Sequence, residues 1–216
     1  SAGSRGITAF LIEKDDAGFS IGQKIEKVGM RGSPTAELVF DDCFVPEDRV
    51  MGPLNGGVGV LMSGLDYERV VLSGIQLGIM QACLDTVIPY LRERKQFGRS
   101  LCEFQGLQWK FAEMKVQLDA ARLLLYRAAI NADNGLPSVE ETTVAKYACN
   151  QAGFAAANEA MQVLGAAGYS QDNLVEYCFR RTRGWQIAGG SLEMMRNRLA
   201  EIVFKRRFAQ RPPTVG

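Results

Sequence analysis

The sequence predicts a mainly α protein with a partial β region at its N-terminal end. Apolar segments bounded by turn residues occupy residues 6–45, whereas apolar residues at helical spacing dominate after Gly56-Gly57. The helical segments are long and their connections are short, which favours an antiparallel bundle. We therefore expect two domains: the end of an antiparallel β domain over residues 1–54, and a helical-bundle domain over residues 55–216.

Strands are predicted over residues 6–13, 19–21, 23–28 and 36–45, the last ending before Pro46. Three or four strands are too few for a complete barrel, and the chain begins almost directly on a strand. We therefore expect the sheet to begin upstream, in a part of the protein that precedes this chain.

Helices are predicted over residues 58–94, 103–132, 139–164, 175–183 and 192–208. Pro89 lies inside the first of them and allows a kink there. Asn134-Gly135 follow the second and are typical of a helix C-terminus. Ser138 is the expected N-cap of the third, and Glu141 stands where a capping box needs an acid.

Charge and hydropathy argue against two classes of partner. The sequence has 25 lysines and arginines and 24 acidic residues, giving a formal net charge of +1. Basic residues are scattered, and the cluster Lys205-Arg206-Arg207 is better explained as a complement to a helix C-terminus. No apolar run is expected to be long enough to span a bilayer, and residues 1–5 have no signal-peptide pattern. We expect no nucleic-acid partner and no membrane span.

Cysteine and histidine usage narrows the chemistry. The cysteines are Cys43, Cys83, Cys102, Cys149 and Cys178. Their odd number and wide spacing indicate neither a disulfide framework nor a zinc site, so a reduced, intracellular setting is expected. Histidine is absent, which excludes histidine-based triads and histidine metal sites within this chain.

One carboxylate lies within an apolar helical pattern. Glu68 occurs between Leu61 and Leu72 among apolar residues at helical spacing, so we expect it to face a partly buried surface. Charge there is costly unless a partner or a function justifies it. Glu68 is therefore either a base that acts once substrate excludes water, or one half of an ion pair with Arg69 or another helix.

Several short motifs occur in order along the chain: Ser4-Arg5-Gly6-Ile7-Thr8-Ala9-Phe10, Gly29-Met30-Arg31-Gly32-Ser33, Gly64-Leu65-Asp66-Tyr67-Glu68-Arg69, Arg94-Lys95-Gln96-Phe97-Gly98 and Phe104-Gln105. Together they make the chain resemble the C-terminal part of a flavin-dependent acyl-CoA dehydrogenase, with the greatest similarity to the isovaleryl-CoA branch of that family. The resemblance extends to about Phe208 and is strongest up to Gln105. It implies the end of a middle β domain followed by a complete C-terminal four-helix domain.

The resemblance also implies a reaction. Members of this family bind FAD, remove a proton from the α-carbon of an acyl thioester and pass a hydride from the β-carbon to the flavin. Most carry the catalytic base in a late Tyr-Glu-Gly-Thr pattern; here residues 186–191 match, and Gly189 stands at the glutamate position. The isovaleryl branch takes its base from an earlier helix, at the position of Glu68. Glu68 is thus the expected catalytic base, and Gly189 and Gly190 are expected substrate-binding positions with room for a branched acyl group.

Further substrate contacts follow from the same resemblance. Asp66, Tyr67 and Arg69 match residues that line the pantetheine and substrate path. Arg69 is alternatively a surface partner of Asp66. Ser4 and Arg5 match a substrate-contacting pair in which the arginine addresses a CoA phosphate, although residues so near a chain end are also typical of a disordered tail.

Arg94, Phe97 and Gln105 match flavin contacts of the family. There they reach the FAD of a neighbouring subunit, so the resemblance implies a homo-oligomer, either a dimer or a tetramer. Without the resemblance, the same string would be interpreted as a helix terminus with Gly98 as its C-cap.

The turn over residues 162–169 matches a cofactor-binding turn that is usually rich in glycine and asparagine. Gln162, Gly165 and Ala166 are its expected FAD-binding residues. Alanine is tolerable there if its φ stays negative. Ser191 and Glu193 match positions that meet the flavin in relatives. A further departure is Arg181, which stands where the family usually has an aspartate.

The leading hypothesis is an FAD-dependent dehydrogenase of a short branched acyl-CoA. The alternatives are a dehydrogenase of an acyl thioester on an acyl carrier protein, and a catalytically degenerate relative that serves as a binding or assembly module. A generic helical scaffold would not explain the ordered motifs. The resemblance further implies an electron-transferring flavoprotein as electron acceptor, and a cytoplasmic location in a bacterium or the mitochondrial matrix in a eukaryote.

Overall fold

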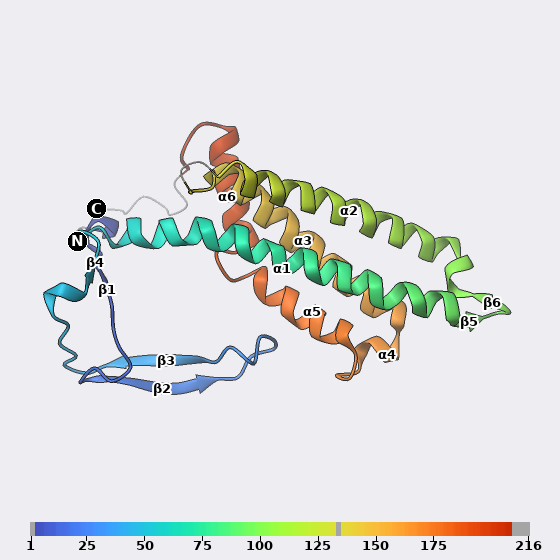
Figure 1. The fold of residues 1–216 in the computed structure, drawn as a ribbon, viewed down its shortest axis with the longest axis horizontal. Helices are drawn as coiled ribbons and strands as arrows, with labels where there is room; N and C mark the ends of the chain where they lie inside the picture. Colours follow the sequence, from blue (N-terminus) through green and yellow to red (C-terminus); the bar gives the residue numbers. More distant parts are fainter. Residues whose placement is uncertain (1–2, 133–134, 209–216) are drawn as a thin grey trace, which may run out of the picture. The chain divides into compact units, whose positions relative to one another are not determined.

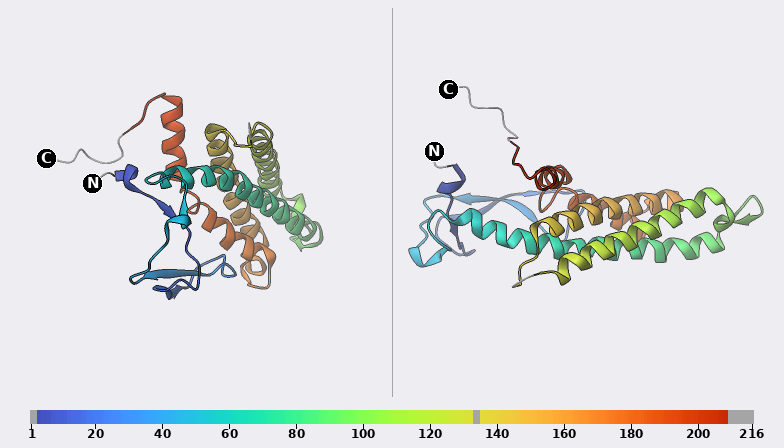
Figure 2. Two further views of the ribbon diagram at one scale, coloured as in Figure 1. Left: turned by 60° about the vertical axis from the view of Figure 1, so that its left-hand side comes forward. Right: turned by 90° about the horizontal axis from the view of Figure 1, so that it is seen from above.

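The computed structural model describes residues 3–132 and 135–208. The chain divides into two compact units, Ser1–Tyr67 and Glu68–Gly216, whose elements are drawn as ribbons in Figures 1 and 2. The division falls within helix α1 (Gly57–Glu93). The predicted domain boundary after residue 54 lies just before that helix, and it stays a prediction.

The first unit contains two antiparallel strand pairs. Strand β1 (Ala9–Phe10) pairs with β4 (Val50–Met51), and β2 (Phe19–Ile25) pairs with β3 (Thr35–Phe40). Two short 3₁₀ turns, η1 (Gly3–Gly6) and η2 (Glu47–Arg49), accompany them. Two-stranded pieces enclose no core of their own, which agrees with the predicted partial β region.

The strand boundaries differ from the sequence predictions. The two segments predicted on either side of Gly22 form one strand, β2, whose register with β3 shifts between Ile21 and Lys24. A glycine in a strand interior is typical of such an irregularity. The strand predicted to reach residue 45 ends at Phe40, because the chain turns at Asp42, which has a φ of 46°. The strand predicted over residues 6–13 is reduced to β1.

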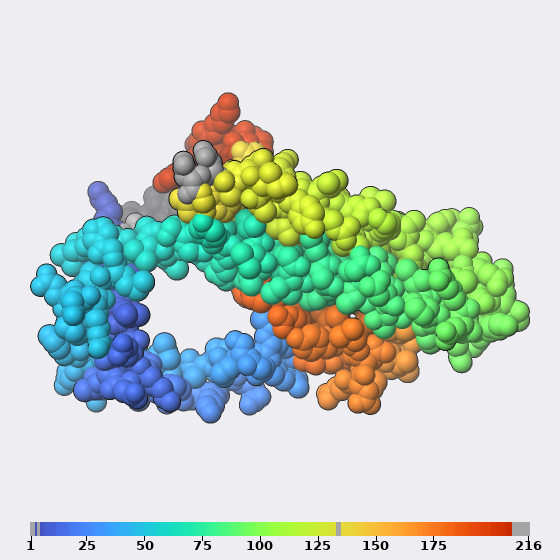
Figure 3. All heavy atoms as spheres, in the orientation of Figure 1, coloured from blue at the N-terminus to red at the C-terminus, as the bar shows by residue number. Residues whose placement is uncertain are grey.

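The second unit is helical. Its remaining helices are α2 (Gln105–Ile130), α3 (Val139–Leu164), α4 (Ala166–Tyr169), α5 (Leu174–Trp185) and α6 (Leu192–Val203). Helix α3 packs against α2, α5 and α6, and α2 and α3 run in opposite directions (Figure 1). The space-filling view shows atoms of α1 and α2 directly against one another along one face (Figure 3). The predicted antiparallel helical bundle is confirmed.

The core of the bundle is formed by apolar side chains from α1, α2, α3 and α5. Its most enclosed members include Met80, Cys83, Val87, Leu118, Cys149, Ala157 and Val175. All five cysteines are free thiols. Because α3 contributes mostly alanines to this core, the neighbouring helices approach it closely.

Helix α3 begins and ends at the predicted residues. The Ser138 hydroxyl accepts a hydrogen bond from the Glu141 amide at 3.5 Å, as expected of an N-cap. In place of the return bond of a capping box, the Glu141 carboxylate accepts a hydrogen bond from Asn131 at 3.0 Å and pairs with Arg127 at 3.3 Å. Helix α2 ends at Ile130, before the predicted end at residue 132; Asn134, the expected stop residue, lies outside the described residues.

The connection between α1 and α2 is a hairpin that was not predicted. Strands β5 (Lys95–Gln96) and β6 (Arg99–Ser100) pair across Phe97 and Gly98, whose φ values are 54° and 79°. Two consecutive residues with positive φ are typical of a type I′ turn. The interpretation of Gly98 as a helix C-cap is therefore wrong, since α1 ends at Glu93.

Helix α1 is, by length and composition, long and apolar enough to cross a membrane. This finding corrects our statement that no apolar run reaches that length. Of its most apolar stretch, 44% is buried inside the molecule. Since the core helix of a soluble protein has the same properties, the finding is weak evidence for a membrane span.

Candidate active site

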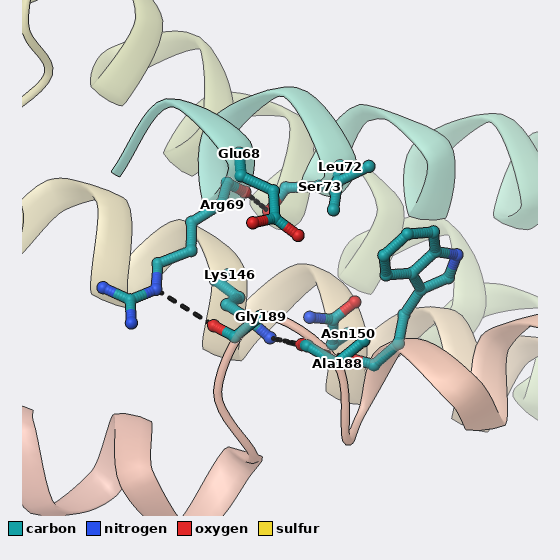
Figure 4. A pocket seen from close by; sticks show the side chains of 9 residues that line it. Glu68, Arg69, Leu72, Ser73, Lys146, Asn150, Ala188 and Gly189 are labelled. Carbon is teal, nitrogen blue, oxygen red and sulfur yellow. Dashed lines mark hydrogen bonds between the residues drawn. The ribbon is translucent and has the colours of Figure 1, made fainter. Parts of the chain in front are cut away.

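A small cavity of about 10 Å³ lies within the second unit, between α1, α3 and the segment that follows α5. Figure 4 shows the side chains around it. They are Glu68, Arg69, Leu72, Ser73, Lys146, Asn150, Trp185, Ala188 and Gly189. The cavity thus joins three stretches of chain that are far apart in the sequence, and three of its residues were predicted from the sequence.

Glu68 and Gly189 lie next to each other in this cavity. A Cβ atom built on Gly189 would be 3.6 Å from Oε1 of Glu68. Gly189 has a φ of 65°, a conformation that glycine adopts without steric cost. The two positions that the sequence matched to alternative sites of a catalytic base are therefore parts of one site.

Arg69 connects α1 to the same segment. Its Nε atom donates a hydrogen bond of 3.1 Å to the carbonyl oxygen of Gly189 (Figure 4). The backbone of Arg69 is itself contacted by Ser73, whose hydroxyl donates to the Arg69 carbonyl at 2.6 Å. A built Cβ on Gly190 would be 3.4 Å from Nη2 of Arg69. Gly189 and Gly190, two expected substrate positions, are thus packed against this guanidinium.

Lys146 is a member of the site that the sequence analysis missed. Only 4% of it is exposed, and its ammonium donates hydrogen bonds to the carbonyls of Ala188 at 2.7 Å and Gly190 at 2.8 Å. The pKa of Lys146 is lowered to about 8, mainly by burial and in smaller part by the charge of Arg69, while the charge of Glu68 acts in the opposite direction. The signal was present in the sequence, because Lys146 shares its helix face with buried residues such as Thr142 and Cys149.

Glu68 itself is less enclosed than predicted. It is exposed in the structure, as are Leu61 and Val71, with 60% and 67% of their surfaces accessible. The expectation that Glu68 faces a partly buried surface is therefore wrong for the described chain. Within the second unit, the buried residues of α1 begin only at Ser73, so helical spacing identified an apolar stretch but not its burial.

Four expected substrate residues belong to the first unit. Ser4 and Arg5 lie in η1, and Arg5 is exposed. Asp66 and Tyr67 precede Glu68 on α1, and Tyr67 is 47% exposed. Arg5 is thus part of a 3₁₀ turn, and the substrate contacts of all four residues stay predictions.

Three expected flavin contacts gather at the hairpin between α1 and α2. Arg94 follows α1, Phe97 occupies the hairpin turn and Gln105 begins α2; all three are exposed, Phe97 by 92%. An open depression of about 530 Å³ lined mainly by apolar side chains, Phe97 and Phe104 among them, lies beside them. Phe97 lines this depression, whereas Arg94 and Gln105 do not. An exposed aromatic ring suits the flat rings of FAD, and a cation and an amide on the same connection suit its pyrophosphate and polar groups.

The second group of expected FAD residues lies in the turn between α3 and α4. Gln162, Gly165 and Ala166 are exposed, and Gly165 has a φ of 61° with open space around it. Ala166 and Ala167 are helical and have no positive φ. The backbone therefore accommodates alanine at both positions, which was the condition set by the sequence.

Ser191 and Glu193 lie directly after the Gly189-Gly190 turn, at the start of α6. The Ser191 hydroxyl accepts a hydrogen bond of 3.4 Å from the Met194 amide and so caps this helix. A backbone hydrogen bond and the Ser191 hydroxyl lower the pKa of Glu193. These residues belong to the end of the bundle that contains Glu68. Arg94 lies at the other end, about 40 Å from Glu68, because each residue of a helix adds about 1.5 Å along its axis.

No group of three or more potential metal ligands occurs among the residues that the structure describes. The residues that line the cavity provide a carboxylate, two cations and a glycine turn. The profile of the family described as "Acyl-CoA dehydrogenase, C-terminal domain" matches residues 55–204.

The chain belongs to the acyl-CoA dehydrogenase family. Isovaleryl-CoA dehydrogenase of Solanum tuberosum, a mitochondrial protein by its name, is 44% identical over 205 residues, covering 95% of this chain and 50% of the relative. The chain thus spans about half the length of the curated relatives it matches.

Solved structures of the family have the same fold. Butyryl-CoA dehydrogenase of Megasphaera elsdenii superposes with a TM-score of 0.89 at 35% identity, over 94% of this chain and 53% of that one. A prolyl acyl carrier protein oxidase superposes with a TM-score of 0.88 at 29% identity, over 93% of this chain and 53% of that one. The predicted family and the predicted fold are therefore confirmed.

Proposed function

We propose that the whole protein catalyses FAD-dependent α,β-dehydrogenation of a short branched acyl-CoA, with Glu68 as the base that removes the α-proton. The observation that carries this proposal is the 3.6 Å separation between Oε1 of Glu68 and a Cβ built on Gly189. A carboxylate attached at either position would reach the same region of the cavity. The chain has a carboxylate at one of them and no side chain at the other.

The chemistry requires such a group. The α-proton of a thioester is weakly acidic, so a carboxylate must come within hydrogen-bonding reach of it, and the negative charge that develops must be stabilised. Bound FAD would supply the hydride acceptor for the β-carbon. Glu68 is accessible to an incoming substrate, and Arg69 and Lys146 place two positive groups beside it.

Gly189 supports the branched-chain part of the proposal. Without a side chain at this position, the space beside Glu68 and Lys146 stays free, because a Cβ there would come within 3.5 Å of the lysine stem. An acyl group with an extra methyl branch would occupy that space. The 44% identity to a dehydrogenase of the branched isovaleryl group agrees with this assignment.

We also propose a homo-oligomer, a dimer or tetramer, that shares its FAD sites. Arg94, Phe97 and Gln105 are exposed at the opposite end of the bundle from Glu68, about 40 Å away along α1. A flavin that accepts hydride beside Glu68 would not also contact Phe97 of the same chain. These residues would therefore hold the FAD of a neighbouring subunit, and Gln162, Gly165 and Ala166 lie at that same end.

An acyl carrier protein is the second candidate carrier of the thioester. The observation that favours it is the TM-score of 0.88 to a prolyl acyl carrier protein oxidase. An electron-transferring flavoprotein is the proposed electron acceptor. The proposed location is the cytoplasm of a bacterium or the mitochondrial matrix of a eukaryote, the latter in agreement with the mitochondrial relative.

The test uses the full-length protein with its flavin. Anaerobic addition of isovaleryl-CoA should bleach the flavin absorbance, and the same acyl group on an acyl carrier protein should bleach it more slowly. Glu68→Gln should lower the rate of bleaching by about 10²–10⁴-fold, the usual contribution of a general base. Glu113→Gln, an exposed acid on α2, is the matched control.

Two results would contradict the proposal. One is a flavin that no short acyl thioester bleaches on either carrier, which would favour the degenerate binding or assembly module. The other is a Glu68→Gln variant that bleaches within tenfold of the wild type, since Glu68 would then not be the base.

A further inference from the structure

We propose that Lys146 is a positioning residue: its ammonium holds the turn at Gly189 and Gly190 in place opposite Glu68. The consequence for catalysis rests on the proposed function of Glu68. The restraint of the turn by Lys146 does not depend on the catalytic role of Glu68, and a separate experiment tests it.

All three donors of the ammonium are directed at one segment. Lys146 Nζ lies 2.7 Å from the carbonyl oxygen of Ala188, 2.8 Å from that of Gly190 and 3.5 Å from that of Trp185. An ammonium has three N–H groups, so these carbonyls account for all of them. Trp185 is the last residue of α5, and a cation at the carbonyl end of a helix is favourable. Lys146 therefore ties the end of α5 to the turn that follows it.

This turn needs an external support. Gly189 and Gly190 have consecutive positive φ values of 65° and 97°, and glycine has more conformational freedom to lose on folding than any other residue. Few backbone bonds restrain the segment: the amides of Ile187 and Ala188 donate to the carbonyl of Gly184, and the amide of Leu192 donates to that of Gln186. Lys146 adds bonds to Ala188 and Gly190, where the backbone is least restrained.

The turn is held from two helices. From α1, Arg69 donates to the carbonyl of Gly189 at 3.1 Å. From α3, the stem of Lys146 passes beneath the same glycine, with Cε 3.5 Å from the position of a built Cβ. That position is 3.6 Å from Oε1 of Glu68. A shift of the turn would therefore change the space between Gly189 and the carboxylate, where the acyl group is proposed to lie.

The charge of Lys146 depends on its immediate neighbours. The charged groups that face it are Glu68 and Arg69, both from α1; the other residues lining the cavity from α3 and from residues 185–190 carry no charge. Burial and Arg69 lower the pKa of Lys146 to about 8. The ammonium is thus the main form at pH 7, and its charge-assisted bonds weaken as pH rises through 8.

The first experiment measures amide hydrogen exchange in the full-length holoenzyme without substrate. Lys146→Met, which removes the donors and keeps the stem length, should accelerate exchange in residues 186–192 by at least tenfold. Lys115→Met, on the exposed face of α2, is the matched control and should leave this segment unchanged. Unchanged exchange in the Lys146→Met protein would overturn the proposal, as would acceleration that is equal throughout α3 and α5.

The second experiment measures turnover of isovaleryl-CoA between pH 6 and pH 10. Lys146→Met should lower kcat at least tenfold with a change in KM below threefold. The wild type should lose activity above about pH 8, and Lys146→Arg, whose guanidinium stays charged, should lack that loss. If Lys146→Met does not fold, Lys146→Arg provides the test. A fall in its activity above about pH 8, as in the wild type, would overturn the proposal.

Different results would contradict the function proposed for Glu68 and the positioning role proposed for Lys146. A wild-type flavin that no acyl thioester bleaches would overturn the function proposed for Glu68 but would leave the exchange result valid. Accelerated exchange in residues 186–192 with unchanged kcat would overturn the positioning role of Lys146 while leaving Glu68 as the base.

Discussion

Replacement of Gly153 by alanine should destabilise the bundle, because α1 and α3 meet there without space for a methyl group. Gly153 of α3 is buried against Gln76 of α1, whose side chain is completely enclosed. A built Cβ would lie 2.3 Å from Oε1 of Gln76 and 3.2 Å from its Cβ and Cδ. The closest of these separations is more than 1 Å short of the 3.4 Å at which ordinary contact begins.

The magnitude follows from two opposing effects. Overpacking of a well-packed core costs about 1–3 kcal/mol, and the enclosure of Gln76 favours the upper part of that range. Replacing a helical glycine by alanine stabilises a helix by about 1 kcal/mol. The net loss should be about 2 kcal/mol, which corresponds to a fall of about 4–8 °C in the midpoint of thermal unfolding.

The assay is thermal unfolding of the full-length protein, followed by far-ultraviolet circular dichroism. Gly78→Ala on α1 is the matched control, because a Cβ there has no neighbour within 4 Å; it should be neutral or stabilising. Gln76→Ala combined with Gly153→Ala should recover stability relative to the sum of the single changes. Equal behaviour of Gly153→Ala and Gly78→Ala would refute the steric reasoning, as would an unchanged cost when Gln76 is already alanine.

Three further predictions concern the site and its helices. Transfer of the carboxylate, with Glu68→Gly and Gly189→Glu together, should bleach flavin with acyl-CoA at least tenfold faster than Glu68→Gly alone, because a Cβ built on Gly189 lies 3.6 Å from Oε1 of Glu68. Equal rates would show that the two positions are not equivalent. Ser138→Ala should lower stability by about 1 kcal/mol through loss of the α3 N-cap without changing kcat, and an unchanged unfolding midpoint would argue against the cap. Lys146 has a pKa of about 8 in the folded state, compared with an ordinary value of 10.5. The free-energy cost of burying its charged ammonium is therefore fully present below pH 8 and is relieved as the pH rises towards 10.5. The free energy of unfolding of the wild type should therefore rise by about 3 kcal/mol relative to Lys146→Met across that interval, and a pH-independent difference in denaturation experiments would contradict this.

Local signals explain why much of the helical domain could be predicted. Helix α3 occupies the predicted residues because its start and end are both encoded nearby: Ser138 caps the first turn, and Gly165 adopts a φ of 61° just after the last. The hairpin after α1 was missed because Phe97 has a positive φ of 54°, a conformation that the sequence does not indicate for an aromatic residue. The second arm of the capping box was wrong: Oε1 of Glu141 accepts from Asn131 and pairs with Arg127, residues at the end of another helix.

The sequence by itself determined the family, the helical bundle and the pairing of a carboxylate at Glu68 with an empty position at Gly189. It did so because helix patterns and motif order depend on residues close together along the chain. Only the tertiary structure decided that these two residues are neighbours, that Lys146 lies beneath the turn, and that Glu68 is exposed. Helical spacing shows which residues share a face, but what covers that face is set by packing between distant segments.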